Sequence, residues 1–181
     1  MSNSMKAYQT LSSRKIYSGQ TISLRVDEVA LPSGKKTIRE VAEHKGAVAV
    51  IALDEAQNVL LVRQFRHAVG RELLEIPAGG LDPGENPAET VRREMQEETG
   101  YLPLKLEPLG GFYLAPGYSS EYLHLFLATG LVAARLIAED TEEIKLVKMP
   151  LNEAIELIHS GEIQDAKSVA GLLYYLKFKT A

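Results

Sequence analysis

The chain has 181 residues and a mass of 19.9 kDa, so one domain, or one domain with an appended segment, can bury a core without disulfides. A net charge of −4, from 20 basic and 24 acidic residues, argues against nucleic acid or an anionic membrane as the partner and favours a small molecule. The absence of cysteine excludes disulfides, thiolate zinc sites and cysteine nucleophiles, and it fits a cytoplasmic location.

The N-terminal residues are predicted to form a small antiparallel β unit. Apolar residues alternate with polar ones in its first strand, at Ile22, Leu24 and Val26. A Pro-Ser-Gly turn at 32–34 then leads into KKTIREVAEH, which completes a hairpin. A hairpin is too small to be stable alone, so its apolar side must pack on something larger. We therefore expect a β subdomain over residues 1–43 and a main domain over 44–181.

The main domain is predicted to be a mixed sheet covered by helices on both faces, an α+β fold. Strands are expected in the apolar runs AVAVIAL, VLLVRQF and LLEIP, and later in LGGFY, YLHLFLATG and EIKLVKMP. Two helices are expected at the C-terminal end, Leu151–His159 and Ala166–Lys177, the second capped by Asp165. The apolar stretch 125–134 is about half of what a membrane span needs, and the N-terminus has no apolar signal region.

An acidic helix is predicted between the third and fourth of these strands. Asn86 can cap it, Pro87 suits its first position, and Gly100 should end it. Three carboxylates gather in its last turns, those of Glu94, Glu97 and Glu98. One interpretation is a solvated acidic face. However, like charges at this spacing repel each other and oppose the helix dipole, so a positive partner is expected beside them.

The flanks of this helix complete a longer motif. It begins at Gly79, passes through Glu85 and ends in REMQEETGY at 93–101. This motif resembles the signature of the Nudix hydrolases, with Tyr101 where an aliphatic residue is usual. The resemblance implies the Nudix fold, an α/β/α sandwich, and hydrolysis of a diphosphate with a divalent cation. Mg²⁺ is the expected ion, with Mn²⁺ or another divalent ion as the alternative, because such ions prefer oxygen ligands.

The resemblance also implies roles for individual residues. The implied metal ligands are the Ala78 carbonyl and the carboxylates of Glu94, Glu97, Glu98 and Glu142. Glu97 and Glu142 are also counted as catalytic, together with Glu85 and Arg93, which would pair to hold the glycine-rich loop on the helix. The match around Glu142 is short, so Asp140 in the same acidic cluster remains an alternative. The glycines of the loop also have a simpler role in turn formation.

Features outside the motif resemble the ADP-ribose pyrophosphatase branch of the family. Pro116 lies sixteen residues beyond Gly100, as in that branch, and REVAEHKGAVAV, VRQFRHAV, LLEIPAGGLDPGE and DAKSVAGLLYYL are placed similarly. The resemblance implies substrate contacts from Arg39, Arg66, Glu75, Gly79, Pro116 and Glu121. Either arginine could instead be an exposed surface charge, and Pro116-Gly117 could be only a turn. The four histidines show no metal-like spacing.

The expected activity is hydrolysis of ADP-ribose to AMP and ribose 5-phosphate. The alternatives are a Nudix diphosphatase for another nucleoside diphosphate derivative, such as a nucleotide sugar or a dinucleoside polyphosphate, and a non-catalytic ligand sensor. The four intact glutamates of the motif argue against the sensor. The resemblance further implies a homodimer with exchanged N-terminal segments, in which Tyr17 or Ile22 would lie against the adenine; Tyr8 is the other aromatic residue in that region.

Overall fold

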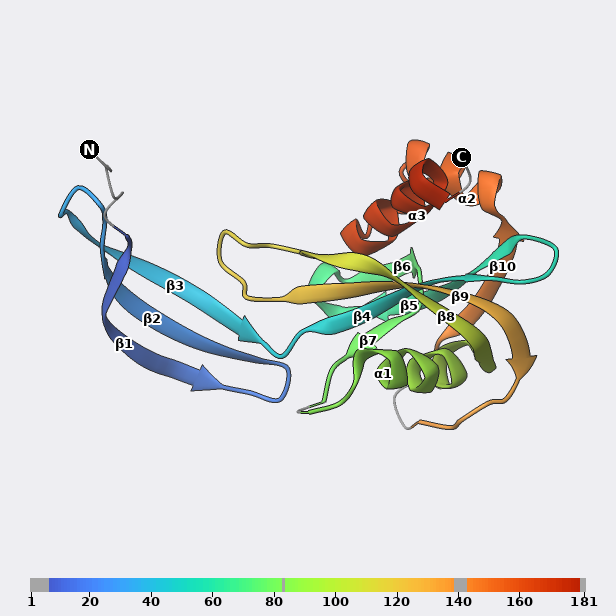
Figure 1. The fold of residues 1–181 in the computed structure, drawn as a ribbon, viewed down its shortest axis with the longest axis horizontal. Coiled ribbons are helices and arrows are strands. Elements are labelled where there is room, and N and C mark those ends of the chain that lie inside the picture. Colours follow the sequence, from blue (N-terminus) through green and yellow to red (C-terminus); the bar gives the residue numbers. More distant parts are fainter. Residues whose placement is uncertain (1–6, 83, 139–142, 180–181) are drawn as a thin grey trace. The chain divides into compact units, whose positions relative to one another are not determined.

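The structure, a computed structural model, describes residues 7–82, 84–138 and 143–179. The chain divides into two compact units. One contains the described residues up to Gly46 together with Tyr113–Tyr122, and the other contains Ala47–Phe112 and the described residues from Leu123 onwards (Figure 1). Among these residues, no helix is both long and apolar enough to cross a membrane.

The first unit is built on a three-stranded antiparallel sheet in the order β1-β2-β3. Its strands are β1 (Gln9–Ser18), β2 (Ile22–Ala30) and β3 (Lys36–His44). The predicted hairpin is confirmed, and Gly34 adopts a φ of 84° in its turn, a conformation that favours glycine. Strand β1 was missed by the sequence analysis because all ten of its residues are exposed and show no buried alternation.

The loop between two later strands belongs to the same unit. The Ala42 N–H donates a hydrogen bond to the Tyr118 carbonyl at 2.8 Å, and the Ser120 N–H donates to the Ala42 carbonyl at 3.0 Å. The rings of Tyr113 and Tyr122 meet edge to face at the base of this loop, with centroids 5.1 Å apart. Residues far apart in the sequence are thus joined in one unit.

The second unit contains a seven-stranded mixed sheet. Its strands are β4 (Ala47–Leu53), β5 (Asn58–Arg66), β6 (Arg71–Glu75), β7 (Ala78–Gly80), β8 (Tyr101–Tyr113), β9 (Tyr122–Ala133) and β10 (Lys145–Pro150). The main order is β10-β5-β4-β9-β8, and β4 and β9 run parallel. Strands β4 and β5 pair only near Ala52 and Leu60; beyond that point β4 pairs with β7 and β5 with β6. Strands β4 and β5 therefore separate at this place, which we call the fork in the sheet.

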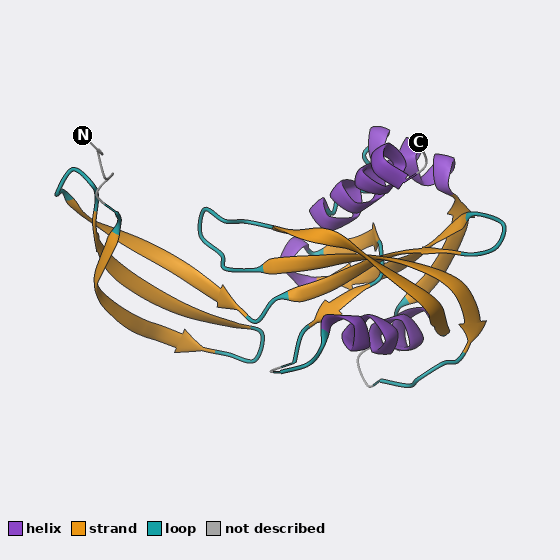
Figure 2. Ribbon diagram, viewed as in Figure 1, coloured by secondary structure: helices purple, strands orange, loops and turns teal. Residues whose placement is uncertain are grey.

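Helices cover both faces of this sheet, as predicted (Figure 2). On one face lie α1 (Pro87–Glu94) and the helical turn η2 (Met95–Thr99), whose Val91 and Met95 pack in a buried cluster with Val50 and Phe126. On the other lie α2 (Leu151–His159) and α3 (Ala166–Lys179). A short helix, η1 (His67–Val69), joins β5 to β6.

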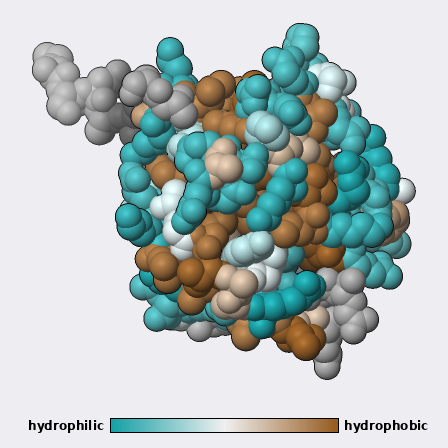
Figure 3. Space-filling view, turned by 90° about the vertical axis from the view of Figure 1, so that its right-hand side faces the viewer, coloured by the Kyte–Doolittle hydropathy of each residue, from teal (hydrophilic) through white to brown (hydrophobic). Residues whose placement is uncertain are grey.

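Helix α3 packs closely against the sheet through a glycine. A Cβ atom on Gly171 would lie 3.1 to 3.2 Å from the side chains of Ile76, Ile51 and Leu125, which leaves no room for a larger residue without repacking. Apolar side chains also reach the surface: hydrophobic and hydrophilic residues are interspersed on the face in Figure 3. The core nevertheless lies between the sheet and its helices, where Leu60, Leu125 and Leu172 are almost fully buried.

Candidate active site

The acidic helix begins as predicted but ends in an unexpected geometry. The Asn86 side chain accepts a hydrogen bond from the Ala88 N–H at 2.9 Å, and Pro87 occupies the first turn. After Glu94 the α-helix widens into a π-helical turn, which ends at Gly100 with a φ of 78°. Such turns occur frequently at functional sites. The widening moves Glu97 and Glu98 away from the positions that a spacing of 100° per residue predicts.

Glu98 is the buried carboxylate of this turn, with only 6% of its surface exposed. Its Oε2 accepts a hydrogen bond from the Ala78 N–H at 3.0 Å. Burial raises the pKa of Glu98 to about 8 and the charge of Glu94 adds to this effect, while the Ala78 hydrogen bond and the positive charges of Arg66 and Lys167 oppose it. A cation bound beside Glu98 would stabilise its ionised form.

Arg93 is the positive partner that the clustered glutamates require. Its Nε and Nη2 donate to the two oxygens of Glu85, each at 3.2 Å. Its Nη1 donates to Glu94 at 2.7 Å and to Glu97 at 3.3 Å. The hydrogen bonds from Arg93 hold the pKa of Glu85 below its usual range. One guanidinium therefore ties the loop before the helix to two carboxylates of its last turns.

The glycine-rich segment lies directly against the same carboxylates. Ala78 and Gly79 form part of β7, opposite Ala49 and Val48 of β4. A Cβ atom on Gly79 would lie only 2.0 Å from Cδ of Glu94, so the residue at position 79 must be glycine for the Glu94 side chain to keep its place. The sequence analysis did not predict β7, because an Ala-Gly-Gly segment has little strand propensity.

Carboxylate and backbone carbonyl oxygens are the ligands that a hard divalent ion prefers. Glu94, Glu97, Glu98 and Ala78 all come together at this place. The described side chains are not, however, gathered into a metal cage of three or more acidic residues or histidines. Arg93 holds Glu94 and Glu97 instead. For these two carboxylates to bind an ion, they would have to exchange Arg93 for it.

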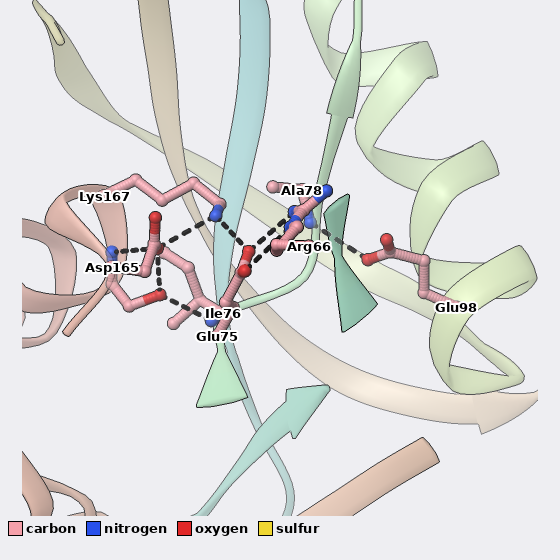
Figure 4. A network of polar contacts seen from close by, with 8 residues as sticks. Arg66, Glu75, Ile76, Ala78, Glu98, Asp165 and Lys167 are labelled. Carbon is pink, nitrogen blue, oxygen red and sulfur yellow. Dashed lines mark hydrogen bonds and ion pairs between the residues drawn. The ribbon is translucent and has the colours of Figure 1, made fainter. Parts of the chain in front are cut away.

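A second polar network lies where the sheet forks (Figure 4). Glu75, 1% exposed, accepts hydrogen bonds from Arg66 Nε at 2.8 Å and Arg66 Nη2 at 2.6 Å, and it also contacts the ammonium group of Lys167. Lys167 also donates to Asp165 at 2.9 Å. Asp165 caps α3 through the Ser168 N–H at 3.0 Å, as predicted. Arg66 and Glu75, which the sequence analysis named separately, are thus direct partners.

Three further sequence-predicted residues, Arg39, Pro116 and Glu121, belong to the first unit. Arg39 is exposed on β3, where it donates to Thr37 Oγ1 at 3.2 Å and to the Ile38 carbonyl at 3.1 Å. Pro116 and Glu121 lie in the loop that belongs to the first unit. Glu142 and its alternative Asp140 lie outside the described residues.

Two polar residues near the site were missed by the sequence analysis. Lys167 is buried, although lysine in the first turn of a helix normally faces water; only its place inside the apolar pattern of α3 could have indicated this. Gln64 is the other: its Nε2 is buried and has no hydrogen-bond partner among the described residues. Alternation along β5 places Gln64 on the same face as Arg66.

Comparison with known proteins resolves the family. Residues 43–172 match the NUDIX domain, and residues 8–42 match the nucleoside diphosphate sugar hydrolase N-terminal domain. The chain belongs to the Nudix hydrolase family. Nudix hydrolases generally need divalent metal ions, which agrees with the oxygen donors of the site. The Nudix box of this chain is the segment from Gly79 to Tyr101 described above.

Several relatives of this Nudix hydrolase are similar over most of their length. The ADP-ribose pyrophosphatase of Bacillus subtilis is 39% identical over 96% of this chain and 94% of its own. The methanol dehydrogenase activator of Bacillus methanolicus is 38% identical over 92% of this chain and 91% of its own. A solved ADP compounds hydrolase superposes with a TM-score of 0.87 over 98% of this chain and 96% of its own, at 21% identity, which confirms the Nudix fold.

Proposed function

We propose that this Nudix hydrolase cleaves the diphosphate of ADP-ribose, with one water molecule, to give AMP and ribose 5-phosphate. The observation that carries the proposal is the arrangement of Gly79 against Glu94, with the buried Glu98 beside it. This arrangement brings together oxygen donors that suit a cation and a loop that can accept a diphosphate. The similarity to an ADP-ribose pyrophosphatase over nearly the whole chain supports the choice of substrate.

The proposed cofactor is Mg²⁺, with Mn²⁺ as the alternative. We propose that the ion is held by the carboxylates of Glu94, Glu97 and Glu98 and by the Ala78 carbonyl, with Glu142 as a further ligand. When bound, such an ion neutralises the diphosphate and lowers the pKa of a coordinated water. Arg93 and Glu85 keep the loop and the helix together while Glu94 and Glu97 change partners.

The proposed substrate contacts are those that the family resemblance implies. Arg66 is the best supported, because Glu75 binds two of its five N–H groups and leaves the others for phosphate oxygens. Gly79 would place its backbone against the diphosphate. Arg39, Pro116 and Glu121 are proposed for the adenosine or the terminal ribose, on the resemblance described above. Glu142 is proposed as the residue that accepts a proton from the attacking water.

We further propose that residues 1–43 act as a dimerising subdomain, with 44–181 as the Nudix domain. Exposed apolar residues on the small sheet support this, among them Leu11, Ile16, Tyr17, Ile22 and Ile38. In the proposed homodimer, the exchanged segment contributes to the partner's adenosine pocket. Sedimentation of the full chain should give a dimer, and a chain beginning at Glu43 should lose both association and affinity for ADP-ribose. A fully active monomer would contradict the shared site.

The principal alternative is a different nucleoside diphosphate derivative. The match of residues 8–42 to the N-terminal domain of nucleoside diphosphate sugar hydrolases favours a nucleotide sugar among these. Phosphate release, coupled to a phosphatase, should be measured with ADP-ribose, a nucleotide sugar and a dinucleoside polyphosphate in the presence of Mg²⁺. The proposal requires the highest kcat/KM for ADP-ribose. A higher value for another substrate would favour the alternative, and binding without turnover of any would favour a sensor.

A further inference from the structure

The structure contains a buried lysine that the proposed reaction does not use. Lys167 lies in the first turn of α3 and is 7% exposed. Its ammonium group contacts two carboxylates, Glu75 at the end of β6 and Asp165 just before α3. The two carboxylates provide compensation for a charge that would otherwise be costly to bury.

Lys167 connects the two helical layers through the fork in the sheet. Helix α3 packs on the face of Ile51 and Leu125, as its contacts with Gly171 show. Arg66 shares a β5 face with Leu60, which packs with Val91 and Met95 of the other layer. Glu75 lies between Lys167 and Arg66 and binds both (Figure 4).

Glu75 binds both Lys167 and Arg66, and it therefore limits how the Arg66 guanidinium can be oriented. Glu75 accepts from Nε and Nη2 of Arg66, so the guanidinium is held along one edge. The Arg66 side chain is still 40% exposed, whereas that of Glu75 is 1% exposed. A carboxylate with one cationic partner can rotate with it, but Lys167 binds the same Glu75 oxygen, Oε2, as Arg66 Nη2, and this second cation restricts the rotation. The plane of Glu75 in turn fixes the direction of the Arg66 guanidinium.

A purely structural role would not need a charge here, because a buried ion pair usually contributes little more stability than apolar residues of the same volume. The backbone of this region also has its own anchor. The Ile76 N–H donates to Ser168 Oγ at 2.8 Å, and Ser168 Oγ donates to Asp165 at 2.6 Å. The junction between β6 and α3 is therefore held without Lys167.

We propose that Lys167 is a positioning residue, which holds Glu75 so that Arg66 keeps one orientation toward the diphosphate. This inference rests on the proposed function, in which Arg66 binds a phosphate oxygen. Lys167 itself touches neither the substrate nor the metal ion. Its effect should therefore appear in KM for the substrate, and it should depend on Arg66.

The test compares Lys167→Met, which keeps an unbranched side chain one atom shorter but removes its charge, with Lys167→Arg, which keeps the charge. The matched control is Lys179→Met, because Lys179 lies on the same helix and pairs with the exposed Glu107. We expect Lys167→Met to raise KM for ADP-ribose on the order of 10-fold with little change in kcat. Lys167→Arg should recover most of the affinity, and Lys179→Met should behave like the wild type.

A double-mutant cycle with Arg66→Ala separates positioning from a structural role. In the Arg66→Ala background, Lys167→Met should change KM less than about twofold, because the residue through which it acts is gone. Equal effects of Lys167→Met in both backgrounds would overturn the proposal. So would an unchanged KM in the Lys167→Met single variant.

A second measurement does not depend on the substrate. The Arg66 Nε–H resonance can be identified by its loss in Arg66→Lys. It should be sharp and slow to exchange with water in the wild type and in Lys167→Arg, but broadened in Lys167→Met. An unchanged resonance in Lys167→Met would refute the positioning role even if ADP-ribose is hydrolysed. The expected broadening in a protein that fails to hydrolyse ADP-ribose would instead refute only the proposed function.

Discussion

Replacing Gly79 by alanine adds one methyl group against Glu94, and we expect this change to reduce activity far more than stability. In Gly79→Ala, the new Cβ would lie 2.0 Å from Glu94 Cδ, whereas ordinary contacts begin at 3.4 Å, so the carboxylate must move by about 1.4 Å. The clashing atoms are the far end of a flexible side chain. We therefore expect a loss in unfolding free energy of about 1 kcal/mol, at the low end for overpacking. A displacement of this size should reduce kcat by about 10²-fold.

The assay measures kcat with ADP-ribose at saturating Mg²⁺, together with the thermal unfolding midpoint. We expect that midpoint to fall by no more than about 4 °C for a chain of this length. Gly80→Ala is the control, because a Cβ at the neighbouring position would meet nothing within 4 Å. It should retain wild-type activity and stability. A Gly79→Ala protein with normal kcat would refute the placement of Glu94 in the metal site.

Three further predictions follow from the carboxylates of the box and of the acidic loop. Glu98→Gln should lower kcat by at least about 10²-fold while the protein stays folded, and undiminished turnover at saturating Mg²⁺ would contradict the metal assignment. The pKa of Glu98 is raised to about 8 in the folded state, so the unfolded chain releases this proton at lower pH than the folded protein does. The free energy of unfolding of the wild-type protein in EDTA should therefore fall by a few kcal/mol between about pH 5 and pH 8. Urea unfolding should show that Glu98→Gln lacks this loss. Glu142→Gln should lower kcat by about 10²- to 10⁴-fold; if Asp140→Asn is the damaging change instead, the loop residue was assigned two positions too late.

The sequence predicted most of the helices and strands because their signals are local. The cap at Asn86, the proline after it and the glycine at position 100 mark the ends of the box helix independently of the rest of the fold. The apolar run of β4 is buried at every residue, so its strand is evident from composition alone. The start of the last helix was likewise marked by its cap, Asp165.

Features that depend on distant contacts were not predictable in this way. The π-helical turn changes the spacing of Glu97 and Glu98, yet the residues MQEET carry no local signal for it. Strand β7 exists because β4 offers it a partner, since glycine does not favour a strand. The contact between Lys167 and Glu75 spans 92 residues of sequence and requires the fork in the sheet. The roles assigned to the box residues came from the family resemblance, which gives identity but not geometry.

The central claim is that the box carboxylates support metal-dependent cleavage of ADP-ribose. Its most direct test is chromatographic identification of the products formed from ADP-ribose and Mg²⁺ by the wild type and by Glu98→Gln in parallel. We expect equal amounts of AMP and ribose 5-phosphate from the wild type, none in excess EDTA, and a rate for Glu98→Gln lower by at least about 10²-fold. The absence of AMP from the wild-type reaction, or AMP formation that neither EDTA nor the substitution reduces, would contradict the claim.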